Sequence, residues 1–296
     1  MTVKVGIGLP QLREFDPRTS VVRAARAAEE IGYDSVWVFE RFLVPKDQSG
    51  EHGLYQQPDV PWPERYAGVL DPLVALTLAA AVTERVELGT CVLVAPLHVP
   101  ARLARTLASL DAASGGRLIA GLGAGWSVDE FAAAAPRPLR ERGAALDEFL
   151  DVAAALWAPD PVSFGNERWT VAPAKVGPKP VRHVPVYLGG FSDAALRRIA
   201  RRGDGWLPTG LPAPAVAARL AQLRELAAEY GRDPSEISCT YQVGLAGEPD
   251  IPAVVEQVAA LEQAGVDHVF LTIANLSRDI DAYLDLAERF HAALRP

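Results

Sequence analysis

Cysteine is scarce in this sequence of 296 residues, and its scarcity excludes several classes of protein. The two cysteines, Cys91 and Cys239, lie far apart within apolar runs, so the sequence has neither a disulfide framework nor a Cys-x-x-Cys metal site. Long apolar runs are also missing. None approaches the roughly 20 residues of a membrane span, and the N-terminus has no apolar signal core. We therefore expect a cytoplasmic protein that does not contact membranes.

An excess of positive charge and the common catalytic motifs are absent as well. The net charge is −8 without a block of like charges, which argues against nucleic acid as a partner. The five histidines form neither a His-x-His nor a His-Glu-x-x-His pair, so no metal site is expected. A Gly-x-Ser-x-Gly motif is also lacking, which removes the common serine hydrolases.

What the sequence does have is a regular alternation of strand and helix patterns from end to end. Such an alternation is typical of a parallel sheet covered by helices. We predict eight strands, over residues 3–9, 35–39, 86–94, 118–122, 186–188, 205–207, 237–243 and 268–272. The predicted helices cover residues 19–31, 72–81, 100–114, 140–157, 192–202, 214–230, 252–264 and 280–294. The pattern therefore predicts an α/β fold, a single (β/α)8 TIM barrel that forms one domain over residues 1–296.

Two long insertions interrupt this pattern, after the second and the fourth strand. Residues 41–70 are rich in proline and contain Tyr55, Trp62 and Tyr66, which offer flat apolar surface. We predict that this segment is a lid and that these three aromatic residues contact the substrate; an oligomer contact or a plain surface loop is the alternative. The second insertion, residues 158–184, contains a predicted hairpin that turns at Gly165-Asn166.

The active sites of such barrels lie at the carboxyl ends of the strands. Glycines dominate there, and glycine allows the backbone to approach a flat or phosphorylated ligand closely. Gly189-Gly190 also leads directly into a helix that Ser192 can cap, and a helix N-terminus attracts anions. The candidate residues at these strand ends are Glu40, Arg41, Thr90, Cys91, Val92, Gly123, Ala124, Gly125, Trp126, Gly189, Gly190, Phe191 and Trp206. We place Trp206 with the substrate residues.

Other chemistries fit these strand ends poorly. The run Gly121-Leu-Gly-Ala-Gly125 lacks the spacing of a dinucleotide-binding loop. No lysine ends a predicted strand, which removes Schiff-base chemistry. The remaining site is poor in acid and base groups, as suits an enzyme whose cofactor carries the difficult chemistry.

Seven runs of the sequence, in order along the chain, resemble the luciferase-like oxidoreductases and within them the branch that depends on coenzyme F420. The runs are Gly32-Tyr-Asp-Ser-Val-Trp-Val-Phe-Glu-Arg41, Leu88-Gly-Thr-Cys-Val-Leu-Val-Ala-Pro96, Ala108-Ser-Leu-Asp-Ala-Ala-Ser-Gly-Gly-Arg117, Gly121-Leu-Gly-Ala-Gly-Trp126, Arg142-Gly-Ala-Ala-Leu-Asp-Glu148, Pro185-Val-Tyr-Leu-Gly-Gly190 and Gly203-Asp-Gly-Trp-Leu-Pro208. They extend from the second to the sixth predicted strand, and the flanking strands fit the same barrel.

The resemblance implies a flavin-like ring in the barrel mouth. Family members have a bulge after the third strand, often with a non-prolyl cis peptide bond, which here falls at Cys91-Val92. The loop from Gly123 to Trp126, with Asp129 and Glu130, and the glycines at 189 and 190 match positions that hold the cofactor tail. One departure is Glu40-Arg41 where several members have Asp-His, because arginine cannot act as a base at neutral pH. We assign Glu40 and Arg41 as tentative catalytic residues; a surface ion pair without a catalytic role is the alternative.

We therefore predict an F420-dependent oxidoreductase that transfers a hydride to or from a small organic substrate. An FMN-dependent monooxygenase is the first alternative, and a non-catalytic protein that binds a flavin or deazaflavin is the second. The arginine-rich composition favours the deazaflavin, because it is typical of actinobacterial genomes. Sugar-phosphate dehydrogenases of the branch carry glutamate where Trp126 stands, so glucose 6-phosphate is not the expected substrate. We also expect a homodimer.

Overall fold

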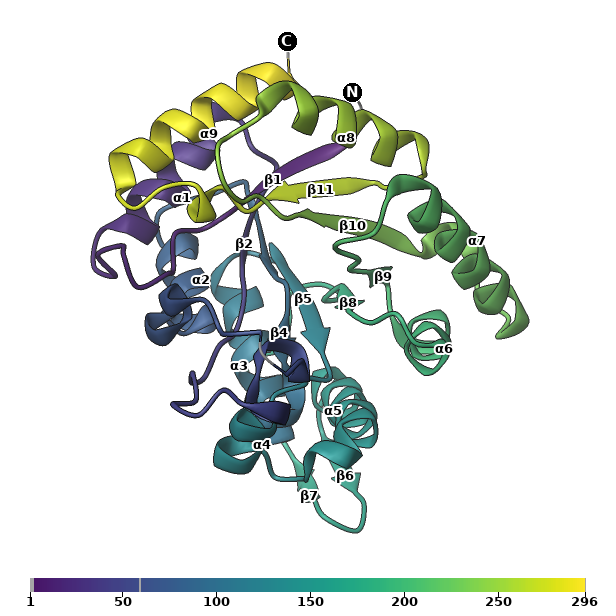
Figure 1. Cartoon of the computed structure of the whole chain (residues 1–296). Coiled ribbons are helices and arrows are strands. Elements are labelled where there is room, and N and C mark those ends of the chain that lie inside the picture. Colours follow the sequence, from purple (N-terminus) through teal and green to yellow (C-terminus); the bar gives the residue numbers. More distant parts are fainter. Residues whose placement is uncertain (1–2, 59, 296) are drawn as a thin grey trace.

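The computed structural model describes residues 3–58 and 60–295, which form a closed barrel of eight parallel strands (Figure 1). Neighbouring strands pair in the order β3, β2, β1, β11, β10, β9, β8, β5, and β3 also pairs with β5, which closes the ring. The strands are β1 (Lys4–Gly8), β2 (Ser35–Val38), β3 (Glu87–Thr90), β4 (Leu93–Val94), β5 (Leu118–Gly123), β8 (Val186–Leu188), β9 (Gly205–Trp206), β10 (Ser238–Val243) and β11 (His268–Leu271). Since β3 and β4 are two parts of one barrel strand, the predicted (β/α)8 barrel is confirmed.

Helices cover the outside of this barrel and follow the strands in sequence. Figure 1 shows α9 beside α1, so the last helix completes the outer layer next to the first. The predicted helices are α1 (Ser20–Ile31), α2 (Pro72–Ala80), α3 (Pro100–Ala113), α5 (Arg142–Trp157), α6 (Asp193–Arg202), α7 (Ala213–Glu229), α8 (Ile251–Gln263) and α9 (Ile280–Leu294). The sequence pattern does not predict α4 (Val128–Ala134), because a short alanine-rich segment has no apolar periodicity; the Ser127 side chain caps it. No helix in the described part of the chain is long and apolar enough to cross a membrane.

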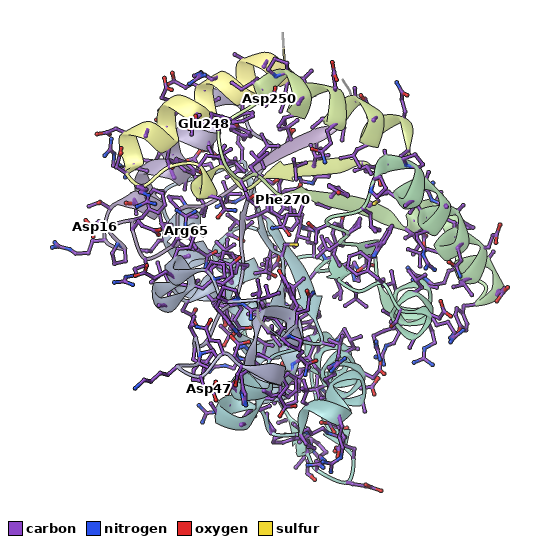
Figure 2. All side chains as sticks on the ribbon, viewed as in Figure 1. Asp16, Asp47, Arg65, Glu248, Asp250 and Phe270 are labelled. Atoms are coloured by element: carbon purple, nitrogen blue, oxygen red, sulfur yellow. The ribbon has the colours of Figure 1, made fainter. Side chains whose placement is uncertain are left out.

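The interior of the barrel is filled by large side chains, with Trp37 at their centre. Its ring stacks on Phe270, with centroids 4.7 Å apart, and Phe270 lies among the strands in the middle of Figure 2. A Cβ atom at position 89 would lie 2.4 Å from the Trp37 ring, so only glycine fits there. Trp37 Nε1 donates to Ser35 Oγ, which also pairs with His268 Nε2 at 2.7 Å. Burial lowers the pKa of His268 to about 3, so this histidine is a neutral, hydrogen-bonded core residue.

Both insertions contain short secondary-structure elements in the part of the chain that the structure describes. Residues 41–70 contain the short 3-10 turns η1 (Gly50–His52), η2 (Leu54–Gln56) and η3 (Glu64–Gly68). The second insertion forms the predicted hairpin, β6 (Val162–Gly165) and β7 (Thr170–Ala174). The buried Glu148 of α5 holds this hairpin, because its carboxylate accepts hydrogen bonds from Asn166 and Trp169 as well as from Arg137.

Candidate active site

A cavity of about 880 Å³ opens at the carboxyl ends of the barrel strands. This volume is in the range of sites that hold cofactors and drug-sized ligands. Large apolar side chains of the barrel interior, among them Trp37, Leu207 and Phe270, form its floor. The predicted site residues that line it are Glu40, Arg41, Tyr55, Tyr66, Cys91, Val92, Gly123, Ala124, Gly125, Trp126, Gly189, Gly190 and Phe191. The structure thus brings together strand ends that are far apart in the sequence.

The third barrel strand is interrupted where it reaches the cavity, and the peptide bond between Cys91 and Val92 is cis, as the resemblance implied. Val92 then projects toward two neighbouring strand ends. A Cβ atom at Gly123 would lie 2.5 Å from Val92 Cγ2, and one at Gly189 would lie 3.2 Å from Val92 Cγ1. These glycines therefore make room for Val92 as well as for a ligand. Burial raises the pKa of the Cys91 thiol to about 12, so Cys91 is no thiolate nucleophile.

The turn from β8 into α6 needs its second glycine for a backbone reason. Gly190 has φ of 139°, and an added Cβ atom would lie 2.7 Å from that of Ala195. Its carbonyl oxygen accepts from Trp206 Nε1 at 3.0 Å, and Trp206 is fully buried on the helix side of the strand. The predicted cap is confirmed, because Ser192 Oγ accepts from the Ala195 backbone N–H. The first turn of α6 and the exposed ring of Phe191 thus border the cavity.

Glu40 and Arg41 do not form the surface ion pair that was the alternative reading, because both are largely buried and have other partners. Glu40 is 7% exposed, accepts from the Val94 backbone N–H at 2.6 Å and lies 2.7 Å from His98 Nε2. The Arg41 guanidinium pairs with Glu130 at 3.1 Å and lies over the Trp62 and Trp126 rings. Arg41 thereby contacts both aromatic rings as well as a carboxylate.

Residues 41–70 lie at the cavity mouth, where Leu54, Tyr55 and Tyr66 line the opening. Tyr55 packs on Trp126 with ring centroids 5.0 Å apart, although its φ of 56° is unusual for a residue other than glycine. Trp62 packs on the other side of Trp126 at 4.8 Å. The segment is therefore a cover of the mouth, which we call the lid segment.

Polar contacts fasten the lid segment at both ends and along its length. The buried Gln11 donates to the Phe39 and Leu70 carbonyl oxygens and accepts from the Phe39 backbone N–H, so it joins the two ends. Glu130 of α4 accepts from the Phe42 backbone N–H, and Asp129 accepts from His52 Nδ1 at 3.0 Å.

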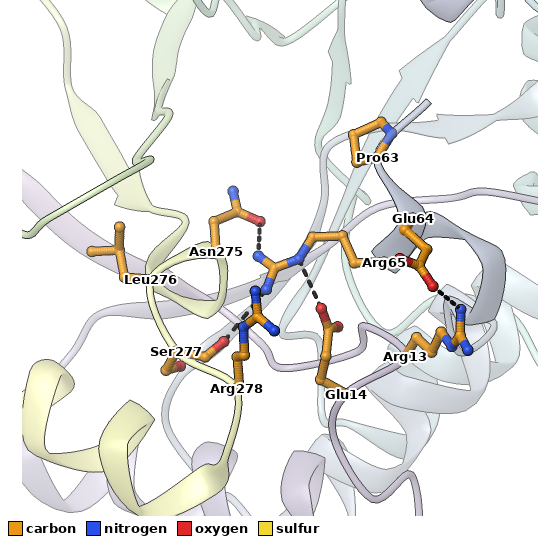
Figure 3. A pocket seen from close by; sticks show the side chains of 9 residues that line it. All are labelled: Arg13, Glu14, Pro63, Glu64, Arg65, Asn275, Leu276, Ser277 and Arg278. Atoms are coloured by element: carbon orange, nitrogen blue, oxygen red, sulfur yellow. Dashed lines mark hydrogen bonds and ion pairs between the residues drawn. The ribbon is translucent and has the colours of Figure 1, made fainter. Parts of the chain in front are cut away.

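A second hollow, of about 510 Å³, lies beside the mouth between the lid segment and the loops after β1 and β11. Figure 3 shows Arg65 of the lid segment between Glu14 and Asn275. Arg65 also donates to the Ser277 carbonyl oxygen, and Arg13 pairs with Glu64 at 2.9 Å. These charged side chains attach the far end of the lid segment to the barrel.

Five predicted contact residues do not line the cavity in the described structure: Thr90, Trp62, Asp129, Glu130 and Trp206. Thr90 Oγ1 bridges to the Gly121 backbone where β3 meets β5. Trp206 packs outside the barrel interior, while Trp62, Asp129 and Glu130 hold the lid segment. In the described structure these five side chains therefore lie outside the lining of the cavity.

Several residues at the cavity have no place in the sequence-based site. Three arginines line its rim: Arg140 from the turn before α5, Arg142 from the start of α5 and Arg198 from α6. Arg142 is the first residue of one of the runs that resemble the family, and the sequence gives no other indication that Arg142 belongs to the site. Gln11 and His98 act through contacts with residues far along the chain, so no local pattern indicates them.

Fold and site together define a barrel with a large cavity at its mouth, which has an apolar floor, arginines in its lining and a lid. Residues 3–262 match the model of the luciferase-like monooxygenase family, and the chain belongs to this family. An uncharacterised protein of Mycobacterium tuberculosis is 32% identical over 258 residues, which are 86% of this chain and 88% of that protein. The F420-dependent glucose-6-phosphate dehydrogenase of Amycolatopsis mediterranei is 33% identical over 199 residues, which are 66% of this chain and 54% of that enzyme.

Solved structures with low sequence identity share the fold. An F420-dependent secondary alcohol dehydrogenase, in complex with an F420–acetone adduct, superposes with a TM-score of 0.78 at 20% identity and covers 100% of both chains. The monooxygenase RslO1 from Streptomyces bottropensis superposes with a TM-score of 0.76 at 20% identity and covers 98% of both chains. The fold is thus shared by an F420-dependent dehydrogenase and by a monooxygenase.

Proposed function

We propose that this protein is an F420-dependent oxidoreductase that transfers a hydride to or from a small organic substrate. The observation that carries the proposal is a cavity with an apolar floor whose lining also contains three arginines, of which Arg198 pairs with Asp147 and Arg140 with Glu141. A flat deazaflavin ring suits the floor, and the anionic tail of F420 suits the rim. The F420-dependent relatives in sequence and fold support this choice of cofactor.

The residues of the cavity fit such a cofactor in two ways. Val92, held in the bulge between Gly123 and Gly189, would back the ring. Arg142 and Arg198, with the N-terminus of α6, would hold the tail. F420, when bound, supplies the hydride acceptor or donor.

The chain supplies placement and a dry environment for this chemistry. Tyr55, Tyr66 and Trp126 would lie over the reacting face and exclude water. Good placement alone lowers a barrier by about 7–11 kcal/mol, so the loss of the family's Asp-His pair does not preclude catalysis. Glu40 is the carboxylate that lines the cavity beside this face, and we assign it to contact with substrate. Trp126 packs between Tyr55 and Trp62, which gives the mouth an aromatic rather than an acidic character.

Fluorescence titration of the purified protein tests the choice of cofactor. We expect micromolar or tighter binding of F420 and binding of FMN that is at least about tenfold weaker, because the F420-dependent relatives in sequence and fold support F420 as the cofactor. Tighter binding of FMN by the same factor would establish the monooxygenase, which the fold of RslO1 keeps as the second candidate. Binding of F420 without turnover of any substrate would indicate a non-catalytic cofactor-binding protein.

A pair of variants checks that the rim holds the tail. Arg142→Gln should weaken F420 binding several-fold, since it removes a cation from the cavity rim. The control is Arg197→Gln, which removes an exposed cation of α6 outside the cavity lining and should leave the affinity unchanged. If the wild type, Arg142→Gln and Arg197→Gln bind F420 with equal affinity, Arg142 does not contact the cofactor.

A further inference from the structure

A carboxylate–imidazole pair lies at the edge of the cavity and joins residues that are 58 positions apart in the sequence. His98 Nε2 lies 2.7 Å from Glu40 Oε1, and Glu40 Oε2 accepts from the Val94 backbone N–H. Glu40 follows β2, whereas His98 follows the 3-10 turn η4 (Ala95–Leu97) after β4. Residues of two different loops thus form the pair.

The pair reaches from the cavity toward solvent. Glu40 lines the cavity and is almost completely buried. His98 lies behind it and is not part of the cavity lining, yet 28% of its side chain is exposed. A proton on Glu40 could therefore reach solvent through a single imidazole, because the distance between the two groups is that of a short hydrogen bond.

The charges around the pair raise the pKa of His98. Burial by itself lowers the pKa of His98, but the hydrogen bond and charge of Glu40, together with the charge of Asp71 at the start of α2, raise it to above its usual value. On the other side of Glu40, Arg41 and Glu130 form an ion pair of their own. His98 can consequently take up and release a proton near neutral pH.

We propose that Glu40 and His98 form a proton relay between the cavity and solvent, which rests on the hydride transfer proposed above. When a secondary alcohol is oxidised, its carbon loses a hydride, with two electrons, to the deazaflavin, and its hydroxyl loses a proton. Glu40 accepts that proton and passes it to Nε2 of neutral His98, whose Nδ1 proton leaves to solvent. Reduction of a carbonyl group uses the same path in reverse. Glu40 is the catalytic residue of this relay, and His98 is its positioning partner.

NMR titration of the histidine imidazoles tests the relay without any substrate. The protein has five histidines, and the spectrum of His98→Gln identifies the His98 signal. We expect Glu40→Gln to lower the midpoint of the His98 titration, because the carboxylate charge is lost. We also expect saturating F420 to shift that midpoint in the wild-type protein and to have no effect in Glu40→Gln, because Glu40 connects His98 with the cavity.

His183 provides a matched control. It lies 2.9 Å from Asp204 and precedes β8, so it belongs to the opposite end of the barrel. Its signal should respond neither to F420 nor to Glu40→Gln. If F420 binds and the His98 midpoint does not move, the relay is overturned and the proposed function stands. If F420 does not bind at all, the proposed function fails and the relay fails with it.

Discussion

Glycines at the strand ends line the cavity and accommodate neighbouring side chains. Gly123 and Gly189 accommodate Val92, whereas Gly190 accommodates Ala195 and has a backbone conformation that side chains disfavour. Gly190 is therefore required by the turn itself. Gly190→Val is therefore not a clean test of cofactor contact, because it would also disturb the start of α6.

Gly190→Ala should destabilise the protein before any ligand is added. A φ of 139° is strained for alanine, and the new Cβ atom would lie 2.7 Å from that of Ala195. We expect a loss of about 1–3 kcal/mol in the free energy of unfolding, measured by thermal denaturation of the apo-protein. Gly165→Ala is the control, because an added Cβ atom there meets no atom within 4 Å. Equal stability of wild type and Gly190→Ala would mean that the turn relaxes without strain.

The lid segment is the element in which aromatic and charged side chains combine to cover the site. Arg41, which lies over the Trp62 and Trp126 rings, belongs to this cover and not to a surface ion pair. His52 adds an attachment that depends on pH. The hydrogen bond to Asp129, and secondarily the charge of that carboxylate, raise the pKa of His52.

Protection of the lid segment against hydrogen exchange should therefore fall as the pH rises. A group with a raised pKa in the folded state stabilises fully below its unfolded pKa, and the stabilisation is lost as the pH rises through the folded pKa. We expect higher protection factors for residues 50–58 at about pH 6 than at about pH 8, after correction for intrinsic exchange rates. In His52→Gln the protection factors should not depend on pH. The same pH dependence in both proteins would assign the effect to another group.

The strands could be predicted because their signal is local, but the direction of each strand-end side chain could not. Successive residues of a strand point to opposite faces, so an error of one position reverses the assignment. Leu207 lines the cavity, whereas its neighbour Trp206 packs against the helices. Cys91 and Thr90 differ in the same way. The roles of His98 and of the arginines at the cavity could not be predicted from the sequence. The closed barrel brings His98 to Glu40 and the arginines to the cavity, and neither contact has a local sequence signal.

At the scale of the whole molecule, α2 stands out because it has no charged residue and yet lies on the surface. Its sequence is Pro-Leu-Val-Ala-Leu-Thr-Leu-Ala-Ala, and one face packs on the barrel through Ala75, Leu76 and Ala79. Val74 is 49% exposed, and Leu73 and Leu78 are partly exposed. A surface helix of a monomer normally has a polar outer face.

We therefore propose that the expected homodimer forms through the outer face of α2. Sedimentation equilibrium should give twice the chain mass of 31.7 kDa for the wild-type protein, because association covers the apolar face. Val74→Glu should shift the protein toward the monomer, since it places a charge in the centre of that face. Val181→Glu is the control: Val181 is 60% exposed but lies in the second insertion, so the dimer should persist. A wild-type protein that sediments as a monomer would show that the apolar face of α2 serves another partner or none, and a dimer that survives Val74→Glu would place the interface elsewhere on the barrel.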